Sequence, residues 1–188
     1  MLVPDAVRAL PELMQRSAPQ ICGPGHITGD SVTGASNTND LLHTLVIIGL
    51  RLGAAPLRDV ELDVTPVDYV AKALVELSLQ PESANREFHL TNPIPIRTRA
   101  LNEWMRLANL ELEMVSYDEW RDRLLKMGND MGIGDIRMLT DVLGPRALGD
   151  DDSHAVHPRF DSNRTQSSLV ASAIRCPLPS TSLFDTYL

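Results

Sequence analysis

Apolar and polar positions along the chain alternate between the period of a strand and the period of a helix. The clearest change of period lies in VELDVTPVDYVAKALVEL, residues 60–77, where every second residue is apolar up to position 64. This alternation predicts a strand with one buried face. Helical spacing follows, and it predicts a buried stripe made of Val67, Val70, Ala71, Leu74 and Val75.

The junction between these two elements carries the signals of a helix start. Thr65 fits the N-cap, and Pro66 fits the first helical position, where its missing N–H costs nothing. Asp68 fits the third position, from which a carboxylate reaches back to the cap amide. We therefore expect a capping box at Thr65, and this structural role is sufficient for both Thr65 and Asp68 without catalysis.

The rest of the pattern predicts further strands and helices in alternation. Strands are expected at residues 18–22, 87–92 and 112–116. Helices are expected at Val7–Ser17, at about 40–53 and at 99–111, and the second of these would have Thr38 or Asn39 as its cap and end at Gly53. A fourth helix would run from a Ser116–Glu119 capping box to Gly128. A fifth would run from an Asp161 cap to the Cys176–Pro177 turn, with a final short segment after it. This alternation favours an α/β or α+β domain over a bundle or a sandwich.

Three of the predicted helices have apolar faces that should be buried. Apolar residues cover most of the circumference of the helix at about 40–53, so we expect it to lie deep in the core. The other two inner faces consist of Leu101, Trp104, Met105 and Ala108, and of Trp120, Leu124 and Met127. Both tryptophans are expected in the core rather than as platforms for a substrate.

Composition and charge limit the function classes. The chain has 188 residues, of which 43% are hydrophobic and 22% charged, as in a single globular domain. The net charge of −8 gives no attraction to nucleic acid or anionic lipid. The longest apolar segment, Leu41 to Gly53, is too short to cross a bilayer, and no secretory signal is recognisable, so we expect a cytoplasmic protein. Cys22 and Cys176 are expected to be buried thiols without chemistry.

The stretch ICGPGHITGD, residues 21–30, resembles a glycine loop that binds a dinucleotide pyrophosphate. Its context does not fit, because Pro24 removes a backbone donor and no amphipathic helix follows for about ten positions. We interpret it as a turn at the end of a strand.

Other catalytic motifs are absent from the sequence. No tyrosine is followed four residues later by lysine, since position 73 is Ala and position 121 is Arg. There is no nucleophile elbow, P-loop or zinc-binding His-Glu-x-x-His motif. His154 and His157 lie near the acidic residues 150–152 and could hold a metal, but an acidic surface loop is the more common meaning of such a tract, and we predict no metal site.

Several segments, in this order, resemble the C-terminal half of thioester reductase domains: ICGPGHITGDSVTGASNTNDLL, DVTPVDYVAKALVELSLQPES, FHLTNP, YDEWRDRL and HPRFDSNRT with the closing CPLP and FDTYL. These domains are extended short-chain dehydrogenases at the ends of nonribosomal peptide and polyketide synthases, and they are similar to carboxylic acid reductases. The resemblance implies an α/β, Rossmann-like fold. The phosphate loop and the catalytic Tyr-x-x-x-Lys helix would belong to a preceding dinucleotide-binding half that this sequence lacks.

The resemblance also implies a division of the chain and a set of site residues. Residues 1–40 would complete the Rossmann-like half, and residues 41–188 would form a substrate-binding subdomain. The turn that closes over the nicotinamide of NADPH would consist of Pro24, Gly25, His26 and Ile27, with Gly23 where the family usually has arginine. The substrate-binding residues would be Gly29, Asn37 and Asp40. No catalytic residue is assigned to the chain.

The implied reaction is NADPH-dependent reduction of an acyl or peptidyl thioester on a phosphopantetheine carrier protein, which releases an aldehyde or an alcohol. This chain would supply the substrate-binding half and would be inactive alone. Alternatives are a docking module for the carrier, a truncated remnant, and a fragment of a fatty acyl-CoA reductase. An exposed strand edge is expected to promote self-association.

Overall fold

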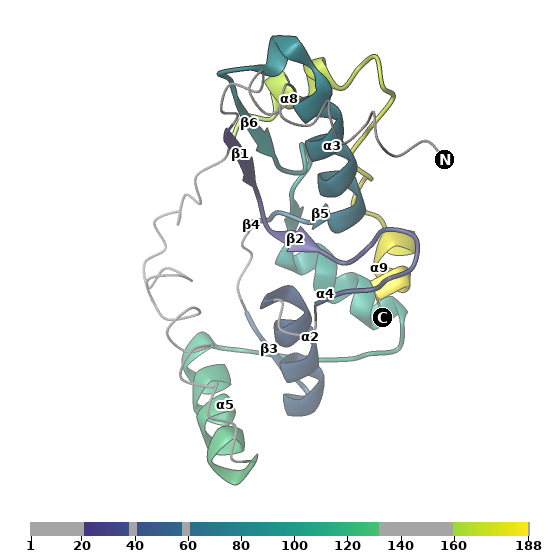
Figure 1. Cartoon of the computed structure of the whole chain (residues 1–188). Coiled ribbons are helices and arrows are strands. Elements are labelled where there is room, and N and C mark those ends of the chain that lie inside the picture. The colour runs from purple at the N-terminus through teal and green to yellow at the C-terminus, as the bar shows by residue number, and fades with distance from the viewer. Residues whose placement is uncertain (1–20, 38–40, 58–60, 132–159, 188) are drawn as a thin grey trace, which may run out of the picture.

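Parallel strand pairs joined by helices make up the computed structural model, which describes residues 21–37, 41–57, 61–131 and 160–187 (Figure 1). Three pairs are parallel: β1 (Ile21–Pro24) with β6 (Glu87–Leu90), β2 (Ile27–Thr28) with β5 (Thr65–Pro66), and β3 (Ala54–Pro56) with β8 (Glu113–Val115). The strands β4 (Glu61–Leu62) and β7 (Ile96–Arg97) are antiparallel. Parallel pairing requires crossover connections, which here contain helices.

Six α-helices and one short 3-10 helix lie in the described ranges. They are α2 (Leu41–Leu52), α3 (Val67–Leu79), α4 (Thr98–Leu107), α5 (Tyr117–Met131), α8 (Asn163–Ser168), α9 (Thr181–Tyr187) and the 3-10 turn Pro81–Ser83. Figure 1 shows α3 beside the β1–β6 pair, with α8 near the end of β6, while α4 and α9 lie together below β2. Helices and parallel strands confirm the predicted α/β class.

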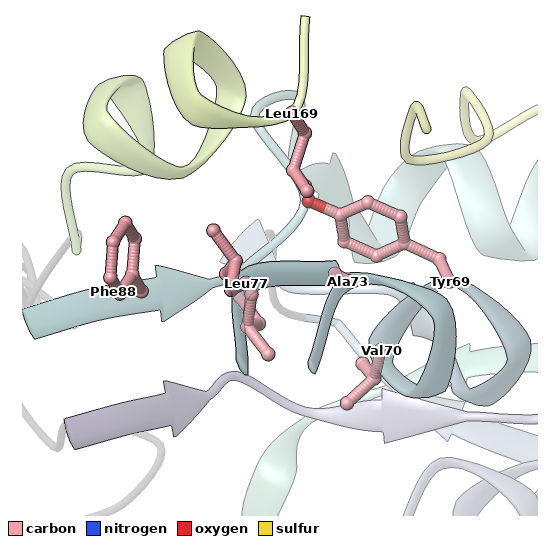
Figure 2. Packing of buried hydrophobic residues seen from close by; sticks show 7 residues of the cluster. Tyr69, Val70, Ala73, Leu77, Phe88 and Leu169 are labelled. Atoms are coloured by element: carbon pink, nitrogen blue, oxygen red, sulfur yellow. The ribbon is translucent and has the colours of Figure 1, made fainter. Parts of the chain in front are cut away.

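The hydrophobic residues gather in three clusters. One lies between α3, the β1–β6 pair and the chain after α8, and it contains Tyr69, Val70, Ala73, Leu77, Phe88, Leu90 and Leu169 (Figure 2). A second joins α4 and α9 to the strand region, with Val64, Ile96, Leu101, Met105, Leu183 and Phe184. The third joins α2 and β3 to α5 through Ile48, Ala54, Val115, Tyr117, Trp120 and Leu124. The second cluster is the one next to the pocket described below.

Most predicted elements are present close to their expected limits. The helix at about 40–53 is α2, and Gly53 follows it with a φ of 62°, the left-handed conformation expected of a glycine that ends a helix. The predicted inner face of α5 is correct, with Trp120 and Leu124 buried and Met127 packed against them. The strands at 87–92 and 112–116 are β6 and β8. The helix expected at Val7–Ser17 and the caps Thr38 and Asn39 lie outside the described residues.

The predicted start of α3 is wrong. Thr65 lies in β5 and its hydroxyl donates to Asp63, so it does not cap the helix, which begins at Val67 with no side-chain cap. The carboxylate of Asp68 instead accepts hydrogen bonds from Ser31 and Lys72. Pairing of β5 with β2 takes precedence over the local cap, because the strand keeps Thr65 extended.

The predicted buried stripe of α3 is also wrong, except for Val70. The buried residues are Tyr69, Val70, Ala73 and Leu77, whereas Val67, Leu74 and Val75 are exposed. Both faces of the helix carry apolar residues, so spacing alone did not identify the face that meets the sheet. Of the strand predicted for 60–64, only β4 is present, and Asp63 and Val64 separate it from β5, which lies beyond the predicted range.

Three further expectations need correction. Among the described side chains of α2 only Ile48 is a buried large residue, so these side chains do not show the deep burial predicted for the helix. Helix α5 continues past Gly128 to Met131, since one glycine is tolerated within a helix. The helix after Asp161 ends at Ser168, well before Cys176, and the chain then turns through Ala173 with a φ of 57°.

Two leucines on α3 provide a test of this packing. Leu77 is 0% exposed beside β6, and Leu79, on the same helix, is 69% exposed. We expect Leu77→Ala to lower the free energy of unfolding by about 2–5 kcal/mol, because it removes buried contacts and leaves a cavity. Leu79→Ala should change it by less than about 0.5 kcal/mol. Urea unfolding followed by circular dichroism measures both, and equal losses would contradict the assigned face.

Candidate functional site

The turn between β1 and β2 is fixed by a carboxylate on the following strand region. Asp63 lies between β4 and β5, and its Oδ2 accepts the backbone N–H of His26 at 3.2 Å. Its Oδ1 accepts the Thr65 hydroxyl at 2.7 Å and the backbone N–H of Asn92 at 3.0 Å. One carboxylate therefore joins the turn to β5, through Thr65, and to the segment that follows β6, through Asn92.

Gly25 is required in this turn because there is no room for a side chain. A Cβ at Gly25 would collide with Asp63 Oδ2 and come within 2.9 Å of the Thr91 methyl carbon. The backbone N–H of Gly25 donates to the carbonyl of Leu90 at 3.2 Å, which continues the pairing of β1 with β6. The turn is thus packed directly on the carboxylate that holds it.

The backbone donors of this turn are already in use. Pro24 has no N–H, Gly25 donates to Leu90, and His26 donates to Asp63. A phosphate site needs several backbone N–H groups directed at the anion. This geometry agrees with the sequence analysis, in which the glycines do not form a phosphate loop. The turn can still offer an outer surface, because Pro24 and Ile27 are exposed, and such a surface suits contact with a flat ring.

A second carboxylate holds the loop that follows β2. Asp68, at the start of α3, accepts the backbone N–H and the hydroxyl of Ser31 at 2.9 and 3.0 Å, and Lys72 Nζ at 2.9 Å. Burial raises the pKa of Asp68, but these hydrogen bonds outweigh it and keep the pKa below its ordinary value. The loop itself is closed by Asp30, whose side chain accepts the backbone N–H groups of Val32 and Thr33.

A small pocket lies where this loop meets α2, α4 and α9. Its volume is about 50 Å³, and its lining consists of Thr28, Gly29, Ser36, His43, Val46, Leu101, Trp104, Met105, Phe184 and Tyr187. The rings of Trp104 and Phe184 lie 4.3 Å apart and form one wall. An apolar lining with a few polar groups at one end is typical of a ligand pocket, and this volume admits only part of a ligand.

Tyr187 closes the polar end of the pocket. Its hydroxyl donates to the carbonyl of Gly29 at 3.0 Å and lies 3.1 Å from the hydroxyl of Thr28. Burial raises the pKa of Tyr187 to about 12. Since its proton is held by a carbonyl and its pKa is raised, Tyr187 is poorly suited to donate a proton to a substrate.

The structure brings only some of the predicted site residues together. Pro24, Gly25, His26 and Ile27 form one continuous turn into β2, and Gly29 lines the pocket directly after it. Asn37 is exposed and is not part of the lining. Asp40 lies outside the described residues.

Sequence reasoning missed most of the pocket. Trp104 was expected in the core, yet it forms part of the pocket wall while also packing on the second cluster. The amphipathic pattern of its helix indicated that Trp104 leaves the surface. No local sequence pattern indicated that Thr28 and Tyr187, which lie far apart in the sequence, would line a pocket. Trp120 is only 1% exposed, which confirms its predicted core position.

Other candidate chemistry lies outside this site. The thiols of Cys22 and Cys176 pack against the cluster of Figure 2, and burial raises the pKa of both, to about 12 for Cys176. Within the described ranges no group of three or more His, Cys, Asp or Glu side chains could hold a metal, and His154 and His157 are not among the described residues. No helix in those ranges is long and apolar enough to span a membrane.

Comparisons with known proteins connect this chain to a family. A family model of NAD-binding domains, described as "Male sterility protein", matches residues 9–74. A linear gramicidin synthase polypeptide of Brevibacillus parabrevis is 32% identical over 81% of the chain, which spans 3% of that protein. Isonitrile lipopeptide synthase of Streptomyces coeruleorubidus is 28% identical over 100% of the chain, which spans 12% of that protein.

Solved structures agree with these matches. The terminal R domain from the myxalamid PKS-NRPS biosynthetic pathway is 35% identical with a TM-score of 0.76, over 89% of this chain and 42% of that domain. A thiolation-reductase di-domain from an archaeal non-ribosomal peptide synthetase is 19% identical with a TM-score of 0.67, over 97% of this chain and 38% of that one, and supports the fold alone. The predicted family and fold class are confirmed, and the chain covers part of a domain. A nicotinamide cofactor is typical of the family.

The hydrogen bonds of Asp68 make stability depend on pH. We expect Asp68→Asn to lower the free energy of unfolding by about 1–3 kcal/mol near neutral pH, because it removes a charged acceptor from Ser31 and Lys72. The folded pKa lies below the ordinary value of 3.8, so this contribution is complete well above 3.8 and is lost as the pH falls below it. Urea unfolding at neutral pH and at about pH 3 should show the difference shrinking.

Asp122→Asn, at an exposed carboxylate on α5, is the matched control and should have little effect at either pH. A difference between wild type and Asp68→Asn that stayed constant down to about pH 3 would contradict the assigned ion pairing.

The contact between Gly25 and Asp63 can be tested with a double-mutant cycle. Gly25→Ala should destabilise the protein by more than about 2 kcal/mol, because the added methyl collides with the Asp63 carboxylate. In an Asp63→Gly background the same substitution should cost at least about 1 kcal/mol less. Unfolding free energies of the four proteins give the coupling, and additive losses would show that the two residues do not touch.

Proposed function

We propose that this chain, which belongs to the thioester reductase domains of the extended short-chain dehydrogenase type, supplies the C-terminal, substrate-binding part of such a domain. The family reaction is reduction of a carrier-bound acyl thioester by NADPH. The observation that carries the proposal is the apolar pocket directly after the β1–β2 turn, in a chain that is 35% identical to a terminal reductase domain. Residues 1–40 then complete the Rossmann-like part, and residues 41–188 form the substrate-binding subdomain.

The turn formed by Pro24, Gly25, His26 and Ile27 would lie against the nicotinamide of NADPH, and the cofactor would supply the hydride. The residues fit such a role as a wall. The N–H groups of Gly25 and His26 are occupied, and the carboxylate of Asp63 holds the turn on its inner side. Pro24 and Ile27 are exposed. Gly29 would then lie at the passage from the cofactor to the substrate pocket. Asn37 and Asp40 are the two further residues proposed to contact the substrate.

The pocket would receive the end of an acyl chain carried on phosphopantetheine. Leu101, Trp104, Met105 and Phe184 offer apolar contacts that exclude water from this end. A volume of about 50 Å³ holds a few heavy atoms, so the pocket would bind one side chain or chain terminus rather than the whole substrate.

The proton donor of the reaction would come from elsewhere. No tyrosine of this sequence precedes a lysine by four residues, and Tyr187 is committed to Gly29. We therefore expect the chain alone to bind an acyl thioester without reducing it, until a dinucleotide-binding part with its tyrosine and lysine is supplied.

Tryptophan fluorescence tests the substrate-binding role. The sequence contains two tryptophans, so Trp120→Phe leaves Trp104, in the pocket wall, as the only one. This substitution removes an indole N–H that has no hydrogen-bond partner among the described residues. Titration with hexanoyl-pantetheine should change the emission of this variant by a saturable amount, because the acyl chain displaces water from the ring.

The matched control is Trp104→Phe, which keeps Trp120 in the third cluster and should show no response. NADPH absorbance followed in the same samples should stay constant. A response from Trp120 alone, or none from either variant, would contradict the pocket as the acyl site and would favour a carrier-docking module. Consumption of NADPH would contradict the proposal that this chain binds the thioester without reducing it.

A further inference from the structure

The two hydroxyl groups at the polar end of the pocket have a fixed hydrogen-bond direction. The Tyr187 hydroxyl donates to the Gly29 carbonyl at 3.0 Å, and a carbonyl can only accept. A tyrosine hydroxyl carries one hydrogen, so the 3.1 Å contact between Thr28 and Tyr187 must be donated by Thr28. Both hydroxyl hydrogens are then used within the protein.

Close packing keeps this arrangement in place. A Cβ at Gly29 would lie 3.0 Å from the Tyr187 ring, so ring and backbone are in direct contact. On the other side of the loop, Gly34 lies against the backbone carbonyl of Thr186, with a φ of 71° that suits glycine. Phe184 meets the Tyr187 ring edge-on at 6.0 Å. Rotation of the Tyr187 hydroxyl away from Gly29 would leave a buried carbonyl with a weaker set of partners.

At this end of the pocket the protein can offer a ligand hydrogen-bond acceptors but no hydroxyl donor. Thr28 Oγ1 and the Tyr187 oxygen keep lone pairs, but neither has a hydrogen left to donate. Ser36, His43 and the indole of Trp104 add polar groups elsewhere on the lining, and the other side chains, Val46, Leu101, Met105 and Phe184, are apolar. A ligand N–H or O–H placed at the Thr28–Tyr187 pair would be satisfied, whereas a carbonyl oxygen there would face lone pairs and lose its hydrogen bond to water.

We propose that the Thr28–Tyr187 pair makes the pocket selective for acyl groups that carry an amide N–H or a hydroxyl in the part that enters the pocket, over acyl groups with only carbon or carbonyl groups there. This inference rests on the proposed function, since it assumes that the acyl chain enters this pocket. It assigns Thr28 and Tyr187 to specificity and gives them no part in proton transfer.

Two thioesters that differ by one group test the selectivity. N-acetylglycyl-pantetheine and 4-oxopentanoyl-pantetheine have the same chain length and carbonyl groups, and the first has N–H where the second has CH2. We expect the full chain to bind the N-acetylglycyl compound about tenfold more tightly, the usual effect of one hydrogen bond. Isothermal titration calorimetry gives both dissociation constants.

Variants identify the residues responsible. Thr28→Val removes one of the two acceptors with little change of shape and should reduce the tenfold difference, while the Tyr187 oxygen remains as an acceptor. Tyr187→Phe releases the Thr28 hydrogen, which can then donate to a ligand carbonyl, so this variant should bind the 4-oxopentanoyl compound more tightly than the wild type does. Tyr69→Phe, on the far cluster of Figure 2, is the matched control and should keep the tenfold difference.

The outcomes separate the two proposals. Equal binding of the two compounds by the wild type, or a tenfold preference that Thr28→Val leaves unchanged, would overturn the selectivity and leave the pocket as an acyl site. Binding of neither compound would overturn the proposed function, and the selectivity with it.

Discussion

The carboxylate of Asp63 is the contact on which the rest of the site depends. It accepts hydrogen bonds from three segments that are distant in sequence, through His26, Thr65 and Asn92. Asn92 in turn donates to the carbonyls of Val64 and Pro177, which adds the C-terminal segment to the same assembly. Because these partners lie on different strands and loops, one acidic group sets their relative positions. The position of Thr28 and Gly29 in the pocket lining therefore depends on the same carboxylate.

The same region explains how far sequence reasoning reached. The change from strand to helix near residue 65 was recognised, and so were α2, α4, α5, β6 and β8, because their signals are local. The capping box at Thr65 had equally good local signals and failed. Thr65 bonds to Asp63 and pairs with β2, and neither partner can be recognised from the spacing of residues 65–68. Asp68 does accept hydrogen bonds, but its donors are Ser31 and Lys72 and not the predicted cap amide.

The candidate site shows the same limit more strongly. The resemblance supplied the turn at Pro24 and Gly25 and the neighbouring Gly29, since those residues form one short stretch. The pocket wall instead combines α2, α4 and α9 with that stretch. The amphipathic pattern of a helix predicts which residues are buried. Trp104 shows that one buried face can pack against the core and also line a pocket. Only the tertiary arrangement distinguishes the two environments.

The pairing of Thr28 with Tyr187 joins positions 159 residues apart. Closing so long a loop costs chain entropy, and local contacts do not offset it. The contact between Thr28 and Tyr187 should therefore form late in folding. During synthesis, the pocket stays open on one side until α9 has left the ribosome, even when β2 and α4 are already in place. A ligand that needs the Phe184 and Tyr187 wall therefore meets this pocket only after α9 has been made, so shorter growing chains do not present it.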